Sequence, residues 1–154
     1  MHSSSDLRIQ TVDVERIIPL RHALLRAGLP LAAARFPGDD LPTSRHWAAL
    51  DHAGRVLGCA TLHLNAWDGQ PAYQLRGMAV APDLQNRGVG RALVRAAEQF
   101  VASTPVLTLW CNARLPAAPF YARMGWRIVS EEFDIPTAGP HVKVLRTLRP
   151  PPAD

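Results

Sequence analysis

The sequence is short of lysine and of aromatic residues. Lys143 is the only lysine among 17 basic residues, and aromatic residues make up 6% of the chain. The arginines that supply the rest of the positive charge are scattered from Arg8 to Arg149, and the net charge is only +4. A nucleic-acid-binding protein usually concentrates its basic residues in a stripe. We therefore expect no nucleic-acid partner, with RNA binding through the arginines as a weaker alternative.

Cysteine is also rare, and the histidines show no metal-ligand spacing. Cys59 and Cys111 each lie inside an apolar run, which favours reduced, buried thiols in a cytoplasmic protein. The six histidines form no H-x-x-x-H or H-E-x-x-H pattern, so we expect no metal. No apolar run approaches the ~18 residues of a membrane span, and residues 1–6 do not resemble a signal peptide. The expected location is the cytoplasm, with no membrane partner.

The length favours one domain. A chain of 154 residues, 47% of them apolar, can bury a sizeable core without a metal or disulfide. We expect a single domain over residues 1–154, in which residues 1–6 and 149–154 are flexible tails.

The hydrophobic pattern predicts more strands than helices. The expected strands are residues 7–12, 46–51, 55–64, 73–80, 106–111, 126–130 and 142–148. The expected helices are residues 14–27, 90–102 and 116–124, with Pro19 as an alternative start of the first helix. Residues 30–45 are rich in proline, glycine and aspartate and predict a long irregular loop, which is usually functional. Helices interleave with strands only in the middle of the chain, so the pattern predicts a mixed α/β (α+β) fold.

The segment that follows the 73–80 strand has the layout of an anion-binding site. A turn at Pro82 leads into Gln-Asn-Arg-Gly-Val-Gly at residues 85–90, and a helix begins there. The first N–H groups of a helix have no intrahelical partner, and the helix dipole is positive at that end. Arg87 and Arg91 can add charge-assisted contacts. The segment matches neither the dinucleotide fingerprint nor the Walker A motif.

Residues 85–90 resemble the Q-x-x-G-x-G motif of the GNAT superfamily of acyl-CoA-dependent N-acetyltransferases. A second stretch is similar to another signature of that family: Asn-Ala-Arg at residues 112–114 is followed by Phe-Tyr at 120–121 and Gly-Trp at 125–126. The resemblance implies a single GNAT-like domain with a mixed, mostly antiparallel central sheet, flanking helices and a cofactor cleft at splayed central strands. It also implies acetyl-CoA as co-substrate.

The resemblance assigns roles to particular residues. Met78 and Val80 would bond the pantetheine arm through their backbone, and the N–H of Met78 would stabilise the oxyanion. Tyr121 would act as the acid that protonates the departing thiolate. The expected cofactor-binding residues are Met78, Ala79, Val80, Gln85, Asn86, Arg87, Gly88, Val89, Gly90, Arg91, Asn112 and Phe120.

The sequence constrains the identity of the general base and of the acceptor less than it constrains the cofactor-binding residues. A histidine suits the proton transfer, and His141, at the entry to the last strand, is the first choice. Weaker candidates are Glu131, Glu132, His63 and His22. For the acceptor, Asp39 and Asp40 could hold a cationic amine, whereas Arg76 could bind an anionic one. These two hypotheses predict opposite substrates, and the sequence leaves both open.

The expected activity is acetyl transfer to the primary amine of a small molecule, by direct attack without a covalent acyl-enzyme. Two alternatives remain: an acyl-CoA-binding sensor without turnover, and acetylation of a protein amine. Relatives of this fold often pair through exposed strand edges, so a homodimer is a further expectation.

Overall fold

The computed structural model describes residues 7–136 and 138–148, and the chain divides into two units. Unit 1 holds the described residues up to His63 together with Arg76–Ala97, and unit 2 holds Leu64–Leu75 and the described residues from Glu98 onward. Strand β4 (Tyr73–Val80) contributes its first three residues to unit 2 and the remainder to unit 1. The expected tails, 1–6 and 149–154, lie outside the described residues.

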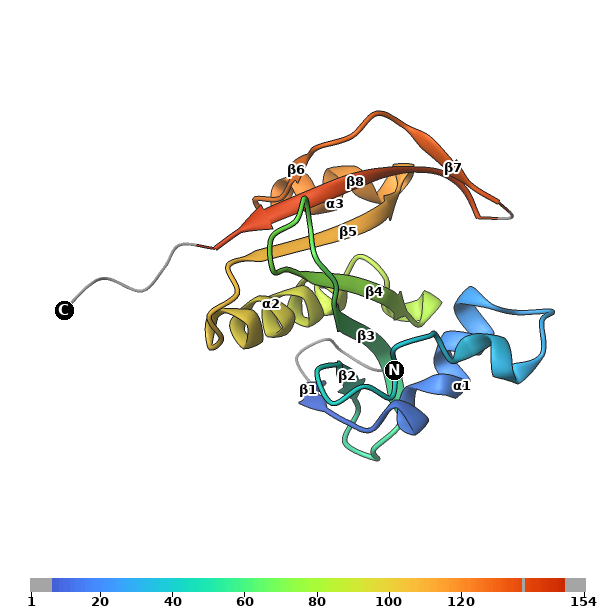
Figure 1. Ribbon diagram of the computed structural model, residues 1–154. Helices are drawn as coiled ribbons and strands as arrows, with labels where there is room; N and C mark the ends of the chain where they lie inside the picture. Colours follow the sequence, from blue (N-terminus) through green and yellow to red (C-terminus); the bar gives the residue numbers. More distant parts are fainter. Residues whose placement is uncertain (1–6, 137, 149–154) are drawn as a thin grey trace. The chain divides into compact units, whose positions relative to one another are not determined.

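Unit 1 is built on strands β1, β2, β3 and the second half of β4, which are neighbours in that order (Figure 1). The first three span Arg8–Thr11, Arg45–Leu50 and Val56–Leu64. β1 and β3 both run antiparallel to β2, with Arg8 opposite Leu50 and Arg45 opposite Leu62. The β2–β3 hairpin and the Tyr73–Val80 strand confirm the sequence predictions for these segments.

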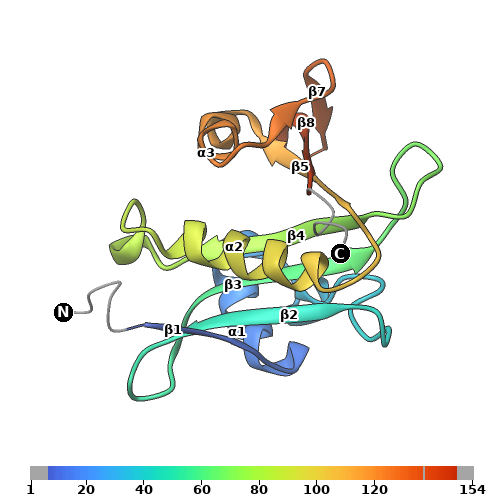
Figure 2. The ribbon, with the colours of Figure 1, turned by 90° about the vertical axis from the view of Figure 1, so that its left-hand side faces the viewer.

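Helices α1 (Val14–Leu25) and α2 (Val89–Ala102) lie on opposite sides of these strands (Figure 2). Side chains alternate between the two faces of a strand. Ile17 of α1 therefore packs in one cluster with Ala48 and Cys59, while a Cβ at Gly58 would contact Val89 and Leu93 of α2. The sheet face under α1 carries the polar network described below, and α2 begins directly after the loop at residues 85–88.

The alternative start of the first helix at Pro19 is wrong, because α1 begins at Val14 and runs through the proline. A proline inside a helix leaves the carbonyl four residues earlier without its N–H partner. Here that carbonyl belongs to Glu15, which is exposed, so water can satisfy it. One segment of the 30–45 loop is also ordered as a 3₁₀ turn, Leu31–Ala34.

Unit 2 contains the start of β4, then β5, β8 and β6, with β7 added on β8. Their bounds are Thr108–Arg114 for β5, Arg127–Ile128 for β6, Phe133–Ile135 for β7 and Gly139–Thr147 for β8. β4 and β5 run parallel, whereas β5, β6 and β7 each run antiparallel to β8. A 3₁₀ turn (Leu115–Ala117) leads into α3 (Ala118–Arg123), which lies on one side of β5 and β8 in Figure 1. The eight strands form the mixed, mostly antiparallel sheet with flanking helices that the sequence predicted.

Several elements of unit 2 differ from the sequence predictions. The predicted strand at 106–111 is shifted toward Arg114, so Asn112 lies inside β5. The strand predicted at 126–130 contains only two ladder residues, and β7 was not predicted at all. Both β6 and β7 are short and pair with a single partner, β8, so their sequences carry little periodicity of their own.

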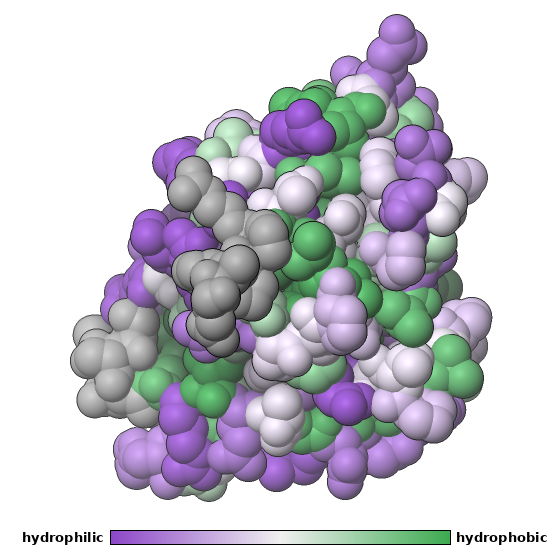
Figure 3. Space-filling view, turned by 60° about the vertical axis from the view of Figure 1, so that its left-hand side comes forward, coloured by the Kyte–Doolittle hydropathy of each residue, from purple (hydrophilic) through white to green (hydrophobic). Residues whose placement is uncertain are grey.

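Apolar residues are not confined to the interior. In Figure 3, green residues lie among white ones in the middle of the face drawn, and purple residues gather mainly along its rim. The thiols of Cys59 and Cys111 are both buried. No helix in the described ranges is long and apolar enough to cross a membrane. Within the same ranges, no three His, Cys, Asp or Glu side chains are grouped as metal ligands.

Candidate active site

The loop between β4 and α2 has the backbone conformation of an anion-binding turn. Asn86 and Gly88 both have positive φ, +64° and +86°, and the residues beside them do not. Such alternation points successive N–H groups toward one side of the chain. The first helical hydrogen bond runs from the N–H of Ala92 to the carbonyl of Gly88, so the N–H groups of residues 89–91 precede it. This end of α2 can therefore accept a phosphate.

The side chains of the loop leave that surface open and make it positive. Gln85, Arg87 and Arg91 are exposed, and a Cβ at Gly88 would have no atom within 4 Å. Gln85 donates from Nε2 to the carbonyl of Val80 at 3.2 Å, which ties the loop back to the end of β4. The residues fit a pyrophosphate, because free N–H groups, a glycine and two arginines lie together.

The second half of β4 carries the other backbone groups predicted to bind the cofactor. In the described ranges, the ladder between β4 and β5 joins only Tyr73 with Leu109 and Gln74 with Trp110. No strand ladder with β5 therefore occupies this edge of β4 at residues 78–80, where Met78 and Val80 are half-buried. An extended ligand can hydrogen-bond to a free strand edge as another strand would.

Tyr121, the predicted acid, lies on α3 in unit 2. Its hydroxyl is 3.7 Å from Sγ of Cys111, and its ring packs against Phe120 and Trp126. The residue is only 3% exposed. Burial, and then Cys111, raises the pKa of Tyr121 well above its ordinary value, so the hydroxyl keeps its proton at neutral pH.

Asn112 faces a basic residue across the β5–β8 ladder. It pairs in register with Lys143, whose Nζ donates to Oδ1 of Asn112 at 2.9 Å. The same ammonium lies 4.8 Å from the ring centre of Trp110. The side-chain amide nitrogen of Asn112 is left as a donor, which suits a pantetheine carbonyl.

His141, the predicted base, lies in β8 opposite Arg114. Its Nδ1 is 2.8 Å from the carbonyl oxygen of Gly139, and a carbonyl only accepts, so Nδ1 carries a proton. In the neutral ring the lone pair is then on Nε2. The residue is 5% exposed and lies beside Phe133.

Asp39 is not the open loop carboxylate that the sequence suggested. Its side chain is fully buried, and its oxygens accept bonds from Arg21 (2.6 Å), His63 (2.8 Å) and the N–H of Phe36 (2.7 Å). Burial alone would raise the pKa of Asp39, but these three hydrogen bonds outweigh it and hold the pKa below its usual range. The carboxylate is already satisfied inside the protein and offers no free oxygen to a cationic acceptor.

A chain of hydrogen bonds continues from Arg21 around this carboxylate. Arg21 Nη2 donates to Thr61 Oγ1 at 2.7 Å, and His46 Nδ1 lies 2.8 Å from the same oxygen. His46 Nε2 bonds the backbone carbonyl of Asp39 at 3.0 Å. Because a carbonyl only accepts, Nε2 carries the proton, and Thr61 then donates to Nδ1. Burial lowers the pKa of His46, which favours this neutral ring.

Sequence reasoning missed the residue at the centre of this network. Arg21 is fully buried, and it occupies the seventh position after Val14 on the buried face of α1, which Ile17 and Ile18 also line. A charged residue at an i+7 position of an apolar stripe is a signal of a buried ion pair. That signal was present in the sequence, but the acidic partner of Arg21, Asp39, lies 18 residues further along the chain in an irregular loop.

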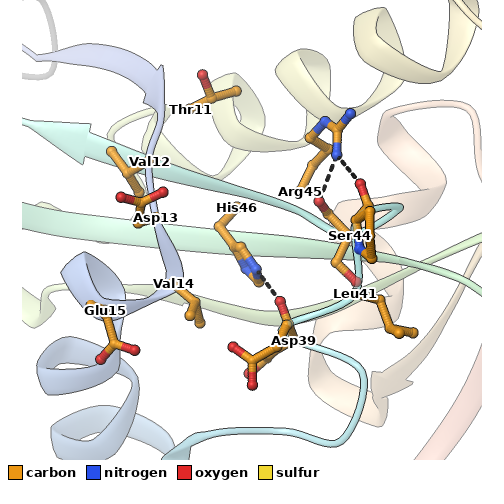
Figure 4. Close-up of a pocket in the computed structure, with 12 residues that line it drawn as sticks. Thr11, Val12, Asp13, Val14, Glu15, Asp39, Leu41, Ser44, Arg45 and His46 are labelled. Atoms are coloured by element: carbon orange, nitrogen blue, oxygen red, sulfur yellow. Dashed lines mark hydrogen bonds between the residues drawn. The ribbon is translucent and has the colours of Figure 1, made fainter.

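A pocket of about 500 Å³ opens beside this network (Figure 4). It is lined by residues Thr11, Val12, Asp13, Val14, Glu15, Asp39, Asp40, Leu41, Pro42, Ser44, Arg45 and His46. Figure 4 shows His46 pointing to the backbone of Asp39. Arg45 donates to the backbone carbonyls of Pro42 and Ser44. None of the predicted cofactor-loop residues lines it.

The structure therefore groups the predicted residues within each unit. Unit 1 brings together the β4 edge, the 85–91 loop, Arg76 and Asp39, and unit 2 holds Asn112, Phe120, Tyr121 and His141. A mixed sheet, a loop with two positive-φ residues after its fourth strand and a helix beginning at that loop agree with the fold that the resemblance to acyl-CoA N-acyltransferases implied.

The similarity of this chain to known proteins supports the same class. The model of the acetyltransferase (GNAT) family matches residues 20–126. The uncharacterised N-acetyltransferase YitI of Bacillus subtilis strain 168 is 32% identical over 149 residues, which cover 93% of this chain and 97% of YitI. The chain belongs to the acetyltransferase (GNAT) family.

Solved structures show the same fold. A GCN5-related N-acetyltransferase from Kribbella flavida superposes with a TM-score of 0.72 at 25% identity, covering 95% of this chain and all of that one. An aminoglycoside 6'-N-acetyltransferase solved with coenzyme A has a TM-score of 0.73 at 17% identity, covering 95% of this chain and 99% of that one. Because the aminoglycoside 6'-N-acetyltransferase is only 17% identical, its likeness to this chain concerns the fold alone.

Proposed function

We propose that the protein transfers an acetyl group from acetyl-CoA to the primary amine of a small-molecule acceptor. The observation that carries the proposal is the loop at residues 85–88, with positive φ at Asn86 and Gly88, immediately before α2. Membership of the acetyltransferase family supports the use of an acyl-CoA.

Different groups of the chain bind different parts of acetyl-CoA. The N–H groups of residues 86–91, with Arg87 and Arg91, hold the pyrophosphate. The backbone of Met78 and Val80 bonds the pantetheine arm along the open edge of β4, and Asn112 and Phe120 contact the same arm. The N–H of Met78 stabilises the charge that develops on the thioester oxygen.

Two proton transfers complete the reaction. The amine nitrogen forms a bond to the thioester carbon, the carbon–sulfur bond breaks, and the thiolate takes a proton from the Tyr121 hydroxyl. The tyrosinate then regains a proton from water, which its raised pKa favours. The proton lost by the amine passes to Nε2 of His141, directly or through water. A raised pKa keeps Tyr121 protonated until the thiolate forms. No side chain of the protein is acylated.

Calorimetric titration with acetyl-CoA is the first test, with CoA and ATP as controls. We expect micromolar binding of acetyl-CoA, about −8 kcal/mol. A screen of amines, read as free thiol released, then tests transfer. Binding without release of thiol for any amine would favour an acyl-CoA sensor, and transfer only to a protein amine would favour the other alternative. Absence of acetyl-CoA binding would overturn the proposal.

A further inference from the structure

The alternation of side chains along strand β4 is interrupted at Gly77. Successive residues of a strand normally face opposite sides of the sheet. Here the guanidinium carbon of Arg76 lies 4.6 Å from the centre of the Phe36 ring, and a Cβ at Gly77 would lie 3.0 Å from Cε2 of the same ring. Gly77 also has a φ of +61°, which residues with a side chain rarely adopt. The strand therefore has a local irregularity directly before Met78.

The irregularity is packed on one side without spare room. A Cβ at Gly77 would also lie 3.0 Å from Nε of Arg21. Arg21 is 0% exposed and Phe36 is 6% exposed. Hydrogen bonds from Arg21 to Asp39 and Thr61 fix the position of its guanidinium. These contacts leave no space for a side chain at position 77, and glycine alone combines this φ with so close an approach.

The carbonyl group of Gly77 has a specific partner on the neighbouring strand β3. Sγ of Cys59 donates to this oxygen at 3.5 Å, and Cys59 is completely buried. Burial raises the pKa of the Cys59 thiol to about 11, although Arg21 and a backbone hydrogen bond from Ala79 oppose this effect. The thiol therefore keeps its proton at neutral pH, and its sulfur contacts the backbone on both sides of Met78.

The carbonyl of Gly77 and the N–H of Met78 belong to one peptide unit. That unit is planar and trans, so its C=O and N–H bonds point in opposite directions. Because the carbonyl is directed toward Cys59 on β3, the N–H of Met78 is directed away from β3. On that side, in the described ranges, the ladder with β5 pairs none of the residues 78–80.

We propose that Cys59 is a positioning residue: its thiol holds the Gly77–Met78 peptide so that the N–H of Met78 is aimed at the thioester oxygen. Arg21 and Phe36 support the same peptide through their contacts with Gly77. This inference rests on the proposed function, in which that N–H stabilises the oxyanion, and adds a residue that needs no contact with cofactor or acceptor. A donor that is aimed before the charge develops costs no reorganisation during the reaction.

Replacing the thiol tests the proposal, with kcat measured on an amine found in the screen described above. Cys59→Ala removes the donor and should lower kcat about tenfold, less than the roughly hundredfold loss that follows removal of an oxyanion donor itself. Cys59→Ser keeps an O–H donor and should retain more activity than Cys59→Ala. In both variants the affinity for CoA, which has no acetyl group, should change far less than kcat.

Ile17→Val is the matched control for the loss of packing. It removes one carbon from the same buried cluster that contains Cys59, and it should leave kcat unchanged. Thermal unfolding checks that each variant is folded at the temperature of the assay.

A substitution at Gly77 tests the packed side of the peptide. Gly77→Ala places a Cβ against Arg21 and Phe36, and it should lower kcat more than Cys59→Ala does. Gly54→Ala controls for backbone strain, because Gly54 also has a positive φ, +83°, and a Cβ there would meet no atom within 4 Å. A loss of kcat in the Gly77 variant alone supports the role of these contacts.

The position of the Met78 N–H can also be followed without turnover. The chain has three methionines, Met1, Met78 and Met124, so labelling with ¹⁵N-methionine leaves few amide signals, and Met124→Leu assigns them. Acetyl-CoA should shift the Met78 amide proton of the wild-type protein more than CoA does. This shift should be smaller in Cys59→Ala.

The outcomes separate this inference from the proposed function. Lack of transfer to any amine would refute the acetyltransferase proposal, whereas a Met78 shift that Cys59→Ala reduces would still support the positioning. A normal kcat in Cys59→Ala, or equal losses in Cys59→Ala and Ile17→Val, would refute the positioning and keep the acetyltransferase. Absence of a Met78 shift when acetyl-CoA is added to the wild-type protein would also overturn the inference.

Discussion

The guanidinium of Arg21 donates to the carboxylate of Asp39 at 2.6 Å, and both side chains are completely buried. This ion pair joins helix α1 to the 30–45 loop, and the bond from Arg21 to Thr61 extends it to β3. Desolvating two charges is costly, and their attraction compensates only when the remaining donors and acceptors are also satisfied. The bonds from His63 and Phe36 meet that requirement for the carboxylate.

Replacing Asp39 by asparagine should therefore destabilise the fold strongly. The change leaves the Arg21 charge buried without its partner, which typically costs about 3–5 kcal/mol. Urea unfolding measures the effect. Asp40→Asn is the matched control, because Asp40 is exposed and water screens its pair with Arg35, so this change should affect stability far less. Equal stability of the two variants would show that the buried pair does not hold the loop.

The same carboxylate predicts how stability depends on pH. The pKa of Asp39 is lower in the folded protein than in the unfolded chain, so its contribution is complete above about pH 4. As pH falls below that value, the unfolded chain gains a proton first, and the free energy of unfolding decreases. His46, whose pKa burial lowers, adds an earlier decrease below about pH 6.5. Measuring the free energy of unfolding from pH 8 to pH 3 tests both predicted decreases. In the Asp39→Asn variant the decrease below about pH 4 should become smaller, while the decrease due to His46 should remain.

Gly88→Ala should weaken acetyl-CoA binding, and Gly54→Ala should not. The two glycines have φ of +86° and +83°, and a Cβ at either would meet no atom within 4 Å. Both substitutions therefore carry the same backbone strain, about 1–2 kcal/mol. Only Gly88 lies in the proposed phosphate loop. Calorimetry with acetyl-CoA measures the change in affinity, and thermal unfolding measures the change in stability that the backbone strain causes. Equal affinity of the two variants for acetyl-CoA would show that the loop does not belong to the binding site.

Tyr121→Phe should lower kcat about a hundredfold and leave the affinity for acetyl-CoA nearly unchanged. The hydroxyl supplies a proton in the proposed transfer, whereas the ring, which packs on Phe120 and Trp126, is retained. Because the pKa of Tyr121 is raised well above its ordinary value, kcat should show no decline from this group below about pH 10. An unchanged kcat in the variant would exclude the hydroxyl as the acid.

His141→Ala should lower kcat about a hundredfold, and added imidazole should restore part of the activity. Rescue of this kind is a property of a missing proton acceptor and not of a packing defect. His63→Ala is the comparison, since Asp39 accepts a bond from Nε2 of His63 and leaves its Nδ1 as a second candidate base. Rescue of the His63 variant alone would move the base to that residue.

Local signals were enough to place many of the elements. Proline and glycine delimit the strand at Tyr73–Val80, and the β2–β3 hairpin flanks a His-Ala-Gly turn, so both were predictable. The loop at residues 85–90 was recognisable because glycines, arginines and a helix start follow one strand. Phe133–Ile135 was not predictable, because a three-residue strand forms only where β8 offers it a partner.

The sequence by itself determined the family, the order of the main strands and helices, and the conformation of the loop before α2. These depend on residues close together in the chain, such as Asn86 and Gly88, whose residue types tolerate positive φ better than most others. Only the tertiary structure decided the role of Asp39, which lies 18 residues from Arg21 and 24 from His63. Burial and pairing across such distances are properties of packing, and they turn an apparent loop acid into part of the core.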